Sequence, residues 1–529
     1  MHIVVADDLP ASAVDLLRAC GWTVDARTGR SAPELAGDLA GADALIVRSA
    51  TKVTADLMAA APRLRVIARA GTGVDNVDVP AASARGLFVM NAPGASSVSV
   101  AEQALALMLS LARQVPAADA AMKQGRWEKK ALKGTELYDK TLGLVGFGRI
   151  GQEVARRALA FGMHVAAHDP FIAEEVARDL GVELLSLEQL CERADYISLH
   201  VPSTPQTRNL FNAERLAACR DGVRLINTAR GDLIDEDALV AAIESGKVAG
   251  AGLDVFKAEP PKGSKLPLLS QVVATPHISA STTEAQELVG TETAAAVRDF
   301  LRDGLVRNAV NFPSVPPETL ARLQPFLKLG QRLGLVLGQM AQGRIHGVGI
   351  RYYGALADGS HQSIVASAVL AGLLKPILSS AVSIVNARAA ATERGIELVE
   401  SQSSRPRPFT SVLSVKLQTS AGERWVEGTV FEDGSLRLVL VDGVALEAPL
   451  GDTLLVVAND DQPGVIGSVG TILGGHGINI ASFALGRADG GAVGVLNLDS
   501  PRDELSAALL DEVRTVPAVR AAWLVRLED

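Results

Sequence analysis

The stretch KTLGLVGFGRIG, residues 140–151, joins a short apolar run to three glycines in G-x-G-x-x-G spacing. The glycines are Gly146, Gly148 and Gly151, and the helical segment QEVARRALAFG follows them. The spacing predicts that Gly146 makes a tight turn, that Gly148 lets the backbone approach a pyrophosphate, and that Gly151 lets helix and strand pack closely. The helix N-terminus would offer unpaired N–H groups to the phosphates. The stretch therefore predicts a dinucleotide-binding unit, and a purely structural βα turn is the alternative.

The next predicted strand, HVAAHDPF, ends near Asp169. A carboxylate at this position accepts hydrogen bonds from ribose hydroxyls and repels a 2′-phosphate. No arginine follows Asp169 immediately. The cofactor expected is therefore NAD and not NADP.

Short apolar runs alternate with helical stretches on both sides of this motif. Before it come HIVVAD, ALIVRS, LRVIARAG, GLFVMNAP and a long helix over residues 97–113, and after it come YISLHVP, VRLINTARG, AGAGLDVF and VVATPHIS. Continuous apolar runs separated by helices are typical of parallel sheets covered on both faces. The predicted fold class is α/β, with two doubly wound parallel-sheet domains.

The pattern changes near residues 308–312, where PSVPPE follows as a boundary signal. Residues 318–450 are helix-rich and then alternate as strands, which predicts an α+β domain without a catalytic motif. The last segments, from TLLVVAND to AAWLVRLED, predict a compact βαββαβ unit.

The composition excludes several classes of function. The chain has 529 residues and a net charge of −9, so several domains and no general nucleic-acid partner are expected. Its apolar stretches are too short or too interrupted to span a membrane, and no secretory signal is seen. Cys20, Cys191 and Cys219 match no zinc spacing and are interpreted as apolar fillers of a reduced, cytoplasmic protein.

Three polar side chains follow successive predicted strands of the second sheet: Arg230 in NTARG, Glu259 in DVFKAEP and His277 in TPHIS. Ligand sites in open α/β sheets lie at the carboxyl ends of the strands. Histidine can take the proton of an alcohol that loses a hydride, a carboxylate can orient the ring, and arginine can hold a substrate carboxylate. The pattern predicts hydride transfer, with a structural histidine as the alternative. A metal site is disfavoured, because no second histidine or cysteine lies at ligand spacing.

Together these segments resemble the D-isomer-specific 2-hydroxyacid dehydrogenases, and among them the long-form members that act on D-3-phosphoglycerate. The resemblance is carried by VRSATKVTADL, ARAGTGVDNVD, GTELYDKTLGLVGFGRIG, NTARGDLIDEDAL, GLDVFKAEPP and TPHISASTTEAQ. It implies that Arg230, Glu259 and His277 are catalytic. The expected dinucleotide contacts are Thr72, Gly146, Gly148, Arg149, Ile150, Gly151, Asp169, Thr228, Ala229 and Asp254.

A phosphorylated substrate needs further cations, and these are expected at strand ends of the first domain. The candidate substrate contacts there are Arg48, Lys52, Arg69, Gly73 and Asn76. The basic stretch MKQGRWEKKALKG also resembles the family segment that reaches a neighbouring subunit's site. Its candidates are Arg126 and Lys129, and a solvated surface is the alternative.

The resemblance also implies how the chain is divided. The substrate-binding domain would comprise residues 1–97 and 286–312, rejoined through the helix after Thr282 and a strand near 308–311. The NAD-binding domain would span residues 98–285, an intervening domain 313–450 and an ACT domain 451–529.

The last domain resembles ACT modules in NDDQPGVIG and GHGINIASF. By that resemblance, Asp461 and Asn479 would hold the ammonium and carboxylate groups of L-serine as an effector. An effector shared between two copies implies a homo-oligomer.

Two residues depart from the family pattern, because Ser279 and Asp232 each stand where the family usually has a glycine. Ser279 would add a side chain near the nicotinamide, and Asp232 a negative charge near Arg230.

The expected activity is NAD-dependent oxidation of D-3-phosphoglycerate to 3-phosphohydroxypyruvate, the first step of L-serine synthesis, under feedback from L-serine. Two alternatives remain at this point. One is a glyoxylate or hydroxypyruvate reductase, and the other is a non-catalytic dinucleotide-sensing protein.

Overall fold

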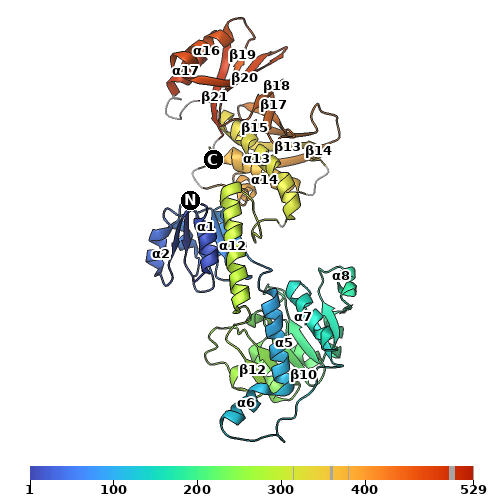
Figure 1. Cartoon of the computed structure of the whole chain (residues 1–529). Helices are drawn as coiled ribbons and strands as arrows, with labels where there is room; N and C mark the ends of the chain where they lie inside the picture. Colours follow the sequence, from blue (N-terminus) through green and yellow to red (C-terminus); the bar gives the residue numbers. More distant parts are fainter. Residues whose placement is uncertain (314, 358–360, 379–380, 500–506, 528–529) are drawn as a thin grey trace.

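The computed structural model describes residues 1–313, 315–357, 361–378, 381–499 and 507–527. Figure 1 shows two α/β domains joined by the long helix α12, with two further domains beyond the first one. The predicted fold class is confirmed.

The first domain is a five-stranded parallel sheet in the order β2-β1-β3-β4-β5. Its strands are β1 (His2–Val5), β2 (Thr23–Ala26), β3 (Ala44–Val47), β4 (Val66–Arg69) and β5 (Phe88–Asn91). Its helices are α1 (Ala11–Arg18), α2 (Ala32–Leu39), α3 (Ala55–Ala59) and α4 (Val79–Ala84). The sequence pattern did not predict β2, because this edge strand is only partly buried and has no continuous apolar run.

The chain returns to the first domain through α12 (Thr283–Asp303), whose apolar side packs against the sheet. The prediction of a strand near residues 308–311 is wrong. Only a single antiparallel bridge joins Ala309 to Met90. Asn308, with φ of 51°, has a left-handed backbone that an extended strand cannot contain.

The second domain is a seven-stranded parallel sheet in the order β12-β11-β10-β9-β6-β7-β8. Its strands are β6 (Thr141–Val145), β7 (His164–His168), β8 (Glu183–Leu184), β9 (Tyr196–Leu199), β10 (Val223–Asn227), β11 (Val248–Leu253) and β12 (Val272–Ala274). The helices are α5 (Ser97–Arg113), α6 (Val115–Lys123), α7 (Arg149–Ala160), α8 (Glu174–Asp179), α9 (Leu187–Arg193), α10 (Ala213–Ala218) and α11 (Glu236–Glu244). Two separate clusters of buried apolar residues cover this sheet, which agrees with its continuous apolar strands.

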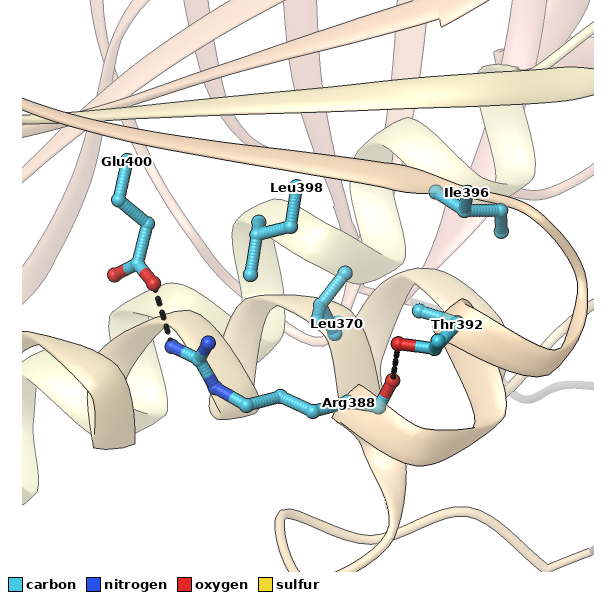
Figure 2. Close-up of a pocket in the computed structure, with 7 residues that line it drawn as sticks. Leu370, Arg388, Thr392, Ile396, Leu398 and Glu400 are labelled. Atoms are coloured by element: carbon cyan, nitrogen blue, oxygen red, sulfur yellow. Dashed lines mark hydrogen bonds and ion pairs between the residues drawn. The ribbon is translucent and has the colours of Figure 1, made fainter.

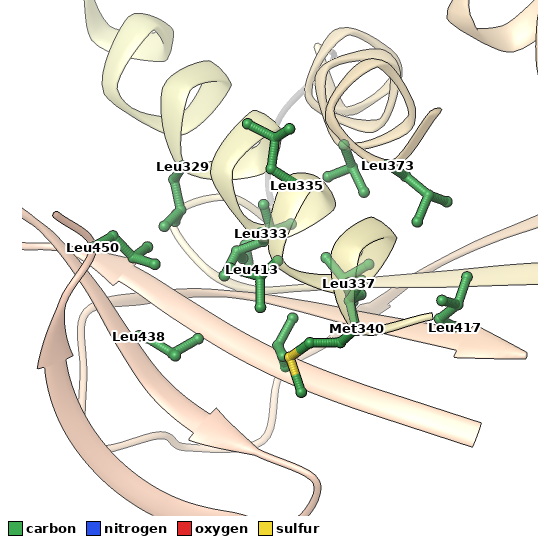
Figure 3. Packing of buried hydrophobic residues seen from close by; sticks show 14 of the residues in the cluster. Leu329, Leu333, Leu335, Leu337, Met340, Leu373, Leu413, Leu417, Leu438 and Leu450 are labelled. Atoms are coloured by element: carbon green, nitrogen blue, oxygen red, sulfur yellow. The ribbon is translucent and has the colours of Figure 1, made fainter. Parts of the chain in front are cut away.

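The third domain packs two helices on a mixed six-stranded sheet in the order β14-β13-β15-β16-β17-β18. Its elements are α13 (Pro317–Met340), β13 (Ile345–Gly354), α14 (Gln362–Leu374), α15 (Ala387–Glu393), β14 (Glu397–Ser403), β15 (Ser411–Thr419), β16 (Gly422–Val430), β17 (Leu436–Val441) and β18 (Val444–Pro449). Figure 3 shows leucines of α13 lying over Leu413, Leu417 and Leu438 of the sheet. Glycines bring α13 and α14 together, since a Cβ at Gly334 would lie 2.1 Å from the Val369 carbonyl oxygen.

The last domain is an antiparallel sheet in the order β20-β21-β19-β22. Its elements are β19 (Thr453–Asn459), α16 (Val465–Gly475), β20 (Asn479–Ala488), β21 (Gly491–Asp499), α17 (Ala507–Arg514) and β22 (Val519–Arg526). This is the predicted βαββαβ order.

The third domain is docked on the first. Ser383 Oγ donates to the Gly86 carbonyl at 2.7 Å, and Asn386 Nδ2 donates to the Ala84 carbonyl at 3.0 Å. Ile384 and Val385 pack on the apolar cluster beneath the first sheet. The domain that follows residue 313 is therefore attached to the domain that carries the candidate substrate contacts. Across the described part of the chain, every helix is too short or too polar to cross a bilayer.

Candidate active site

The glycine loop between β6 and α7 has the geometry that a dinucleotide requires. Gly146 has φ of 95°, and a Cβ there would lie 2.6 Å from the His200 carbonyl oxygen. A Cβ at Gly151 would lie 2.4 Å from the Gly146 carbonyl oxygen, so the helix packs closely on the turn. At Gly148 an added Cβ meets nothing within 4 Å among the described residues. The loop is closed on its protein side and open above Gly148, which fits a pyrophosphate at the start of α7.

Asp169 lies beside this loop at the end of β7. Its Oδ2 accepts a hydrogen bond from the Phe147 amide at 2.8 Å, and its Oδ1 accepts one from the Phe171 amide at 2.9 Å. Thr228 follows β10, and its buried Oγ1 has no partner within the described residues. Thr228 and the glycine loop both lie at the carboxyl ends of strands of the same sheet. A buried hydroxyl without a partner at this edge fits a bound polar cofactor.

Four further predicted cofactor contacts lie on the first or the second α/β domain. Thr72 Oγ1 lies 3.2 Å from Ser96 Oγ, just before α5. Arg149 is exposed, and a Cβ at Gly94 would lie 2.4 Å from its Nη1. Ile150 is half-buried in the first turn of α7. The backbone at Ala229 is held by Asn227, because the Ala229 amide donates a hydrogen bond to Asn227 Oδ1 at 3.0 Å.

Asp254 is fully buried and organises the loop that carries His277. Its carboxylate accepts the amides of Ile278 and Ser279, each at 2.9 Å, and the hydroxyls of Thr275 and Ser279. Its carbonyl accepts the His277 amide at 2.8 Å. The Ser279 side chain is thus turned onto Asp254 and buried, so the extra hydroxyl does not project into open space near the expected nicotinamide.

His277 and Glu259 form a pair. His277 Nδ1 lies 2.7 Å from Glu259 Oε2, and Glu259 Oε1 accepts the Phe256 amide at 3.1 Å. Because an ionised carboxylate only accepts, the ring donates its Nδ1–H, and a neutral ring then has its lone pair on Nε2. The His277 side chain is 50% exposed, so a substrate can reach it.

Arg230 follows β10, which is separated from β12 by β11. Strands β12, β11 and β10 are neighbours in the sheet, and they are followed by His277, Glu259 and Arg230 respectively. Arg230 Nε and Nη2 both donate to Oδ2 of Asp75, at 3.1 and 2.9 Å. Asp75 follows β4 of the first domain, so this ion pair crosses between the two α/β domains. The sheet edge that carries Arg230 therefore faces the first domain.

The candidate cations of the first domain surround this contact. Arg69 is largely buried, and burial, followed by the charge of Arg230, lowers the pKa of its guanidinium. Its Nε has no hydrogen-bond partner in the described parts of the chain. Asn76 Nδ2 donates to the carbonyls of Arg48 and Thr51, both at 2.6 Å, and so shapes the loop after β3. Lys52 is exposed on that loop.

Gly73 allows the Arg230 side chain to approach the first domain. A Cβ on Gly73 would lie 1.9 Å from Arg230 Nη2 and 2.7 Å from Asp75 Oδ2. Lys129 is exposed on the loop after α6, and Figure 1 shows α6 at the end of α5 that points away from the first domain. In the described residues, no hydrogen bond or ion pair joins Lys129 to the residues of the cleft.

The expected effector residues lie in the last domain. Asp461 follows β19 with φ of 53°, and its Oδ1 is 3.1 Å from Arg487 Nε. Asn479 is the exposed first residue of β20. Their roles stay predictions.

Sequence reasoning missed two residues of this region and misplaced a third. Asp75 lies within ARAGTGVDNVD, where a carboxylate next to a glycine-rich turn was the available signal. His200 follows β9 beneath the glycine loop, and burial lowers the pKa of its ring to about 4. Asp232 Oδ2 accepts hydrogen bonds from Ser203 Oγ at 2.5 Å and Arg208 Nε at 3.4 Å, so its charge is paired with Arg208, whereas Arg230 pairs with Asp75.

A separate cavity of about 350 Å³ lies in the third domain. It is lined by Leu370, Arg388, Ala391, Thr392, Ile396, Leu398 and Glu400. Figure 2 shows Arg388 paired with Glu400 at one end of it, at 2.6 Å. The cavity contains none of the predicted site residues. In the described residues, no group of three His, Cys, Asp or Glu side chains could hold a metal ion.

Comparison with protein-family models identifies three regions. Residues 105–279 match the D-isomer specific 2-hydroxyacid dehydrogenase, NAD binding domain. Residues 322–442 match the D-3-phosphoglycerate dehydrogenase intervening domain, and residues 453–518 match the ACT domain.

Relatives match this chain over nearly its whole length. The chain is 41% identical over 527 residues to D-3-phosphoglycerate dehydrogenase of Synechocystis, covering 99% of this chain and 94% of the relative. It is 41% identical over 530 residues to D-3-phosphoglycerate dehydrogenase of Methanocaldococcus jannaschii, covering 100% of both chains. Among solved structures, D-lactate dehydrogenase from Aquifex aeolicus complexed with NAD and lactic acid is 31% identical, with a TM-score of 0.52. It covers 59% of this chain and 100% of its own.

Proposed function

The chain belongs to the D-3-phosphoglycerate dehydrogenase family, and we propose that it uses Arg230, Glu259 and His277 to oxidise D-3-phosphoglycerate to 3-phosphohydroxypyruvate. It is an NAD-dependent oxidoreductase of L-serine biosynthesis. The observation that supports the residue roles best is the hydrogen bond of 2.7 Å between His277 Nδ1 and Glu259 Oε2. These two residues follow strands β12 and β11, and Arg230, which reaches the first domain, follows the neighbouring strand β10.

The groups of this pair suit an alcohol oxidation. NAD, when bound, accepts the hydride from the carbon that carries the hydroxyl. His277 takes the hydroxyl proton at Nε2, because Nδ1 is engaged by Glu259. The Glu259 carboxylate holds the ring in position and stabilises its positive charge after the proton has moved. In the reverse direction, the same nitrogen returns the proton to the product carbonyl.

Arg230 is the group that we assign to the substrate carboxylate. Its planar fork can bind a carboxylate through two parallel hydrogen bonds, and its charge polarises the carbonyl of the product. Arg48, Lys52 and Arg69 supply the positive charge of the first domain for the phosphate. Gly73 leaves the space in which Arg230 reaches that domain.

The experiment that tests this assignment is a steady-state assay of NADH formation with D-3-phosphoglycerate, beside unphosphorylated 2-hydroxy acids. We expect a clear preference in kcat/KM for the phosphorylated acid. A preference for an unphosphorylated acid would favour a reductase of glyoxylate or hydroxypyruvate. NADH binding without turnover of any of these acids would favour a dinucleotide-sensing protein.

We further propose that L-serine is an effector and that the chain works as a homo-oligomer. The ACT domain supports an amino-acid ligand, and Asp461 and Asn479 are the residues proposed to hold its ammonium and carboxylate groups. Lys129, exposed on the loop after α6, suits a contact with the site of a neighbouring copy. The three cysteines are free, which supports the reducing cytoplasm as the compartment.

A further inference from the structure

The residue that occupies Arg230 in this structure is an acid of the first domain. Both Arg230 Nε and Arg230 Nη2 donate to the same oxygen of Asp75, at 3.1 and 2.9 Å. We propose that Asp75 is an internal carboxylate that occupies the Arg230 guanidinium when substrate is absent and that the substrate carboxylate must displace it. This inference rests on the proposed role of Arg230 as the group that binds the substrate carboxylate.

The contact has the chemistry of the interaction that it would replace. An aspartate presents the same group as a 2-hydroxy acid, and the nitrogens that it engages belong to the planar donor face of the guanidinium. The absence of a side chain at Gly73 makes room for this contact, because a Cβ there would lie 1.9 Å from Arg230 Nη2 and 2.7 Å from Asp75 Oδ2. A substrate carboxylate that binds these two nitrogens of Arg230 would need the place that Asp75 Oδ2 holds.

Asp75 is also placed to leave. Its side chain is 70% exposed, whereas that of Arg230 is 33% exposed. Within the described residues, Arg230 is the sole hydrogen-bond partner of the Asp75 carboxylate. Displacing Asp75 into water breaks one partly exposed ion pair, and ion pairs of this kind contribute little, so the cost of displacement is small.

The neighbouring charges explain why an acid is needed there in the absence of substrate. Arg48, Arg69 and Arg230 repel one another, and the Asp75 charge favours the ionised form of the buried Arg69. Asp75 thus balances a cationic site until the negatively charged substrate arrives. The two ends of the pair lie in different domains, so its displacement also removes one contact between them.

The variant that tests this proposal is Asp75→Asn, which keeps the side-chain shape and removes the charge. Without the competing carboxylate, we expect KM for D-3-phosphoglycerate to fall about two- to fivefold, the range expected for a partly exposed ion pair. Turnover at saturating substrate should stay within about twofold, because Asp75 has already left when the reaction occurs. Oxalate is an inert probe of the same carboxylate site, and its dissociation constant in the presence of NADH, measured by calorimetry, should fall by the same factor.

Asp8→Asn is the matched control. Asp8 follows β1 at the same edge of the first sheet and is exposed, and only its backbone carbonyl is in contact with Arg48. An equal fall in KM in both variants would mean that general charge, and not occupation of Arg230, sets the affinity. A fall in kcat with KM unchanged would mean that Asp75 positions Arg230 during the reaction. Either result would overturn the proposal.

The oxalate arm keeps this inference separate from the proposed function. If the unmodified chain does not turn over D-3-phosphoglycerate, the proposed function fails, and oxalate binding still tests the displacement of Asp75. If turnover is normal and oxalate binds both proteins equally, the displacement fails and the proposed function stands.

Discussion

The backbone at His277 has φ of 54°, a left-handed conformation that a non-glycine residue adopts only when its surroundings hold it there. The holding group is Asp254, which accepts the amides of His277, Ile278 and Ser279 through its carbonyl and carboxylate oxygens. Ser99 Oγ adds a hydrogen bond to the Ser279 carbonyl at 2.6 Å. Buried hydrogen bonds therefore fix the backbone of the loop that carries His277, and this places the exposed ring next to Glu259.

Replacing His277 by alanine should lower kcat roughly 100- to 10,000-fold, the usual contribution of a general acid–base group. The dissociation constant of NADH, measured by fluorescence titration, should change little, because the ring is expected to contact the reacting hydroxyl and not the phosphates.

His164→Ala is a close control for that variant. His164 also pairs with a carboxylate, Asp139, at 3.0 Å, but it begins β7 at the opposite edge of the sheet. This control should keep its turnover. A large loss of NADH affinity in His277→Ala would show instead that the histidine supports the fold of the cofactor site.

At the scale of the elements, strand β9 is followed directly by His200, a histidine whose ring is harder to protonate than usual. His200 is buried beneath the glycine loop, and burial lowers the pKa of its ring from 6.5 to about 4. Its Nε2 lies 2.9 Å from Ser198 Oγ, and its carbonyl oxygen limits the space at Gly146. A protonated ring at this position would place a charge directly under the dinucleotide turn.

Folding should therefore weaken on acidification. In the unfolded chain the ring takes up a proton near pH 6.5, whereas in the folded chain it does so near pH 4. The unfolded state binds more protons between these values, so the free energy of unfolding falls as the pH drops from 6.5 towards 4 and is unaffected above 7. At pH 5 the loss due to His200 should be about 2 kcal/mol.

Urea unfolding of the native chain and of His200→Gln at pH 7.5 and pH 5.0 measures this effect. The variant should lose less stability than the native chain over that interval. His164→Gln, altered at an exposed ring, should lose as much as the native chain. Equal losses in all three proteins would contradict the assignment.

At the scale of the whole molecule, the third domain is attached to the domain that carries the candidate substrate contacts. Asn386 and Ser383 bond the carbonyls of Ala84 and Gly86, at the end of α4 and just beyond it. The strand that follows, β5, pairs with β4, which ends at Arg69. The third domain therefore contacts the first domain next to the strand that pairs with β4, which ends at Arg69.

The proposed regulation is tested at this scale by Asn479→Ala. If Asn479 holds the effector carboxylate, the concentration of L-serine that gives half inhibition should rise about fivefold or more, while kcat and KM without serine stay the same. Asp489→Asn, altered just beyond the opposite end of β20, should keep the native sensitivity. Unchanged inhibition in Asn479→Ala would refute the placement of the effector.

Sequence alone was sufficient for the apolar strands of the two α/β domains, for the long helix α5 and for the βαββαβ order of the last domain. The helix predicted over residues 97–113 is α5, Ser97–Arg113, and the glycine spacing predicted the turn before α7. Such features follow from local periodicity and from backbone conformations that glycine alone tolerates, and both are readable within a few residues. The weak strands β2, β8 and β14 were missed because pairing with neighbours, and not their own composition, makes them strands.

Only the tertiary structure decided which side chains meet. That Arg230 is held by Asp75, 155 positions away in the chain, depends on how two separate sheets face each other across the cleft. The orientation of Ser279 depends on a buried carboxylate 25 positions away. Contacts of this kind are set by the packing of whole domains, because burial and charge act through space, and a linear pattern contains no information on which distant residues share that space.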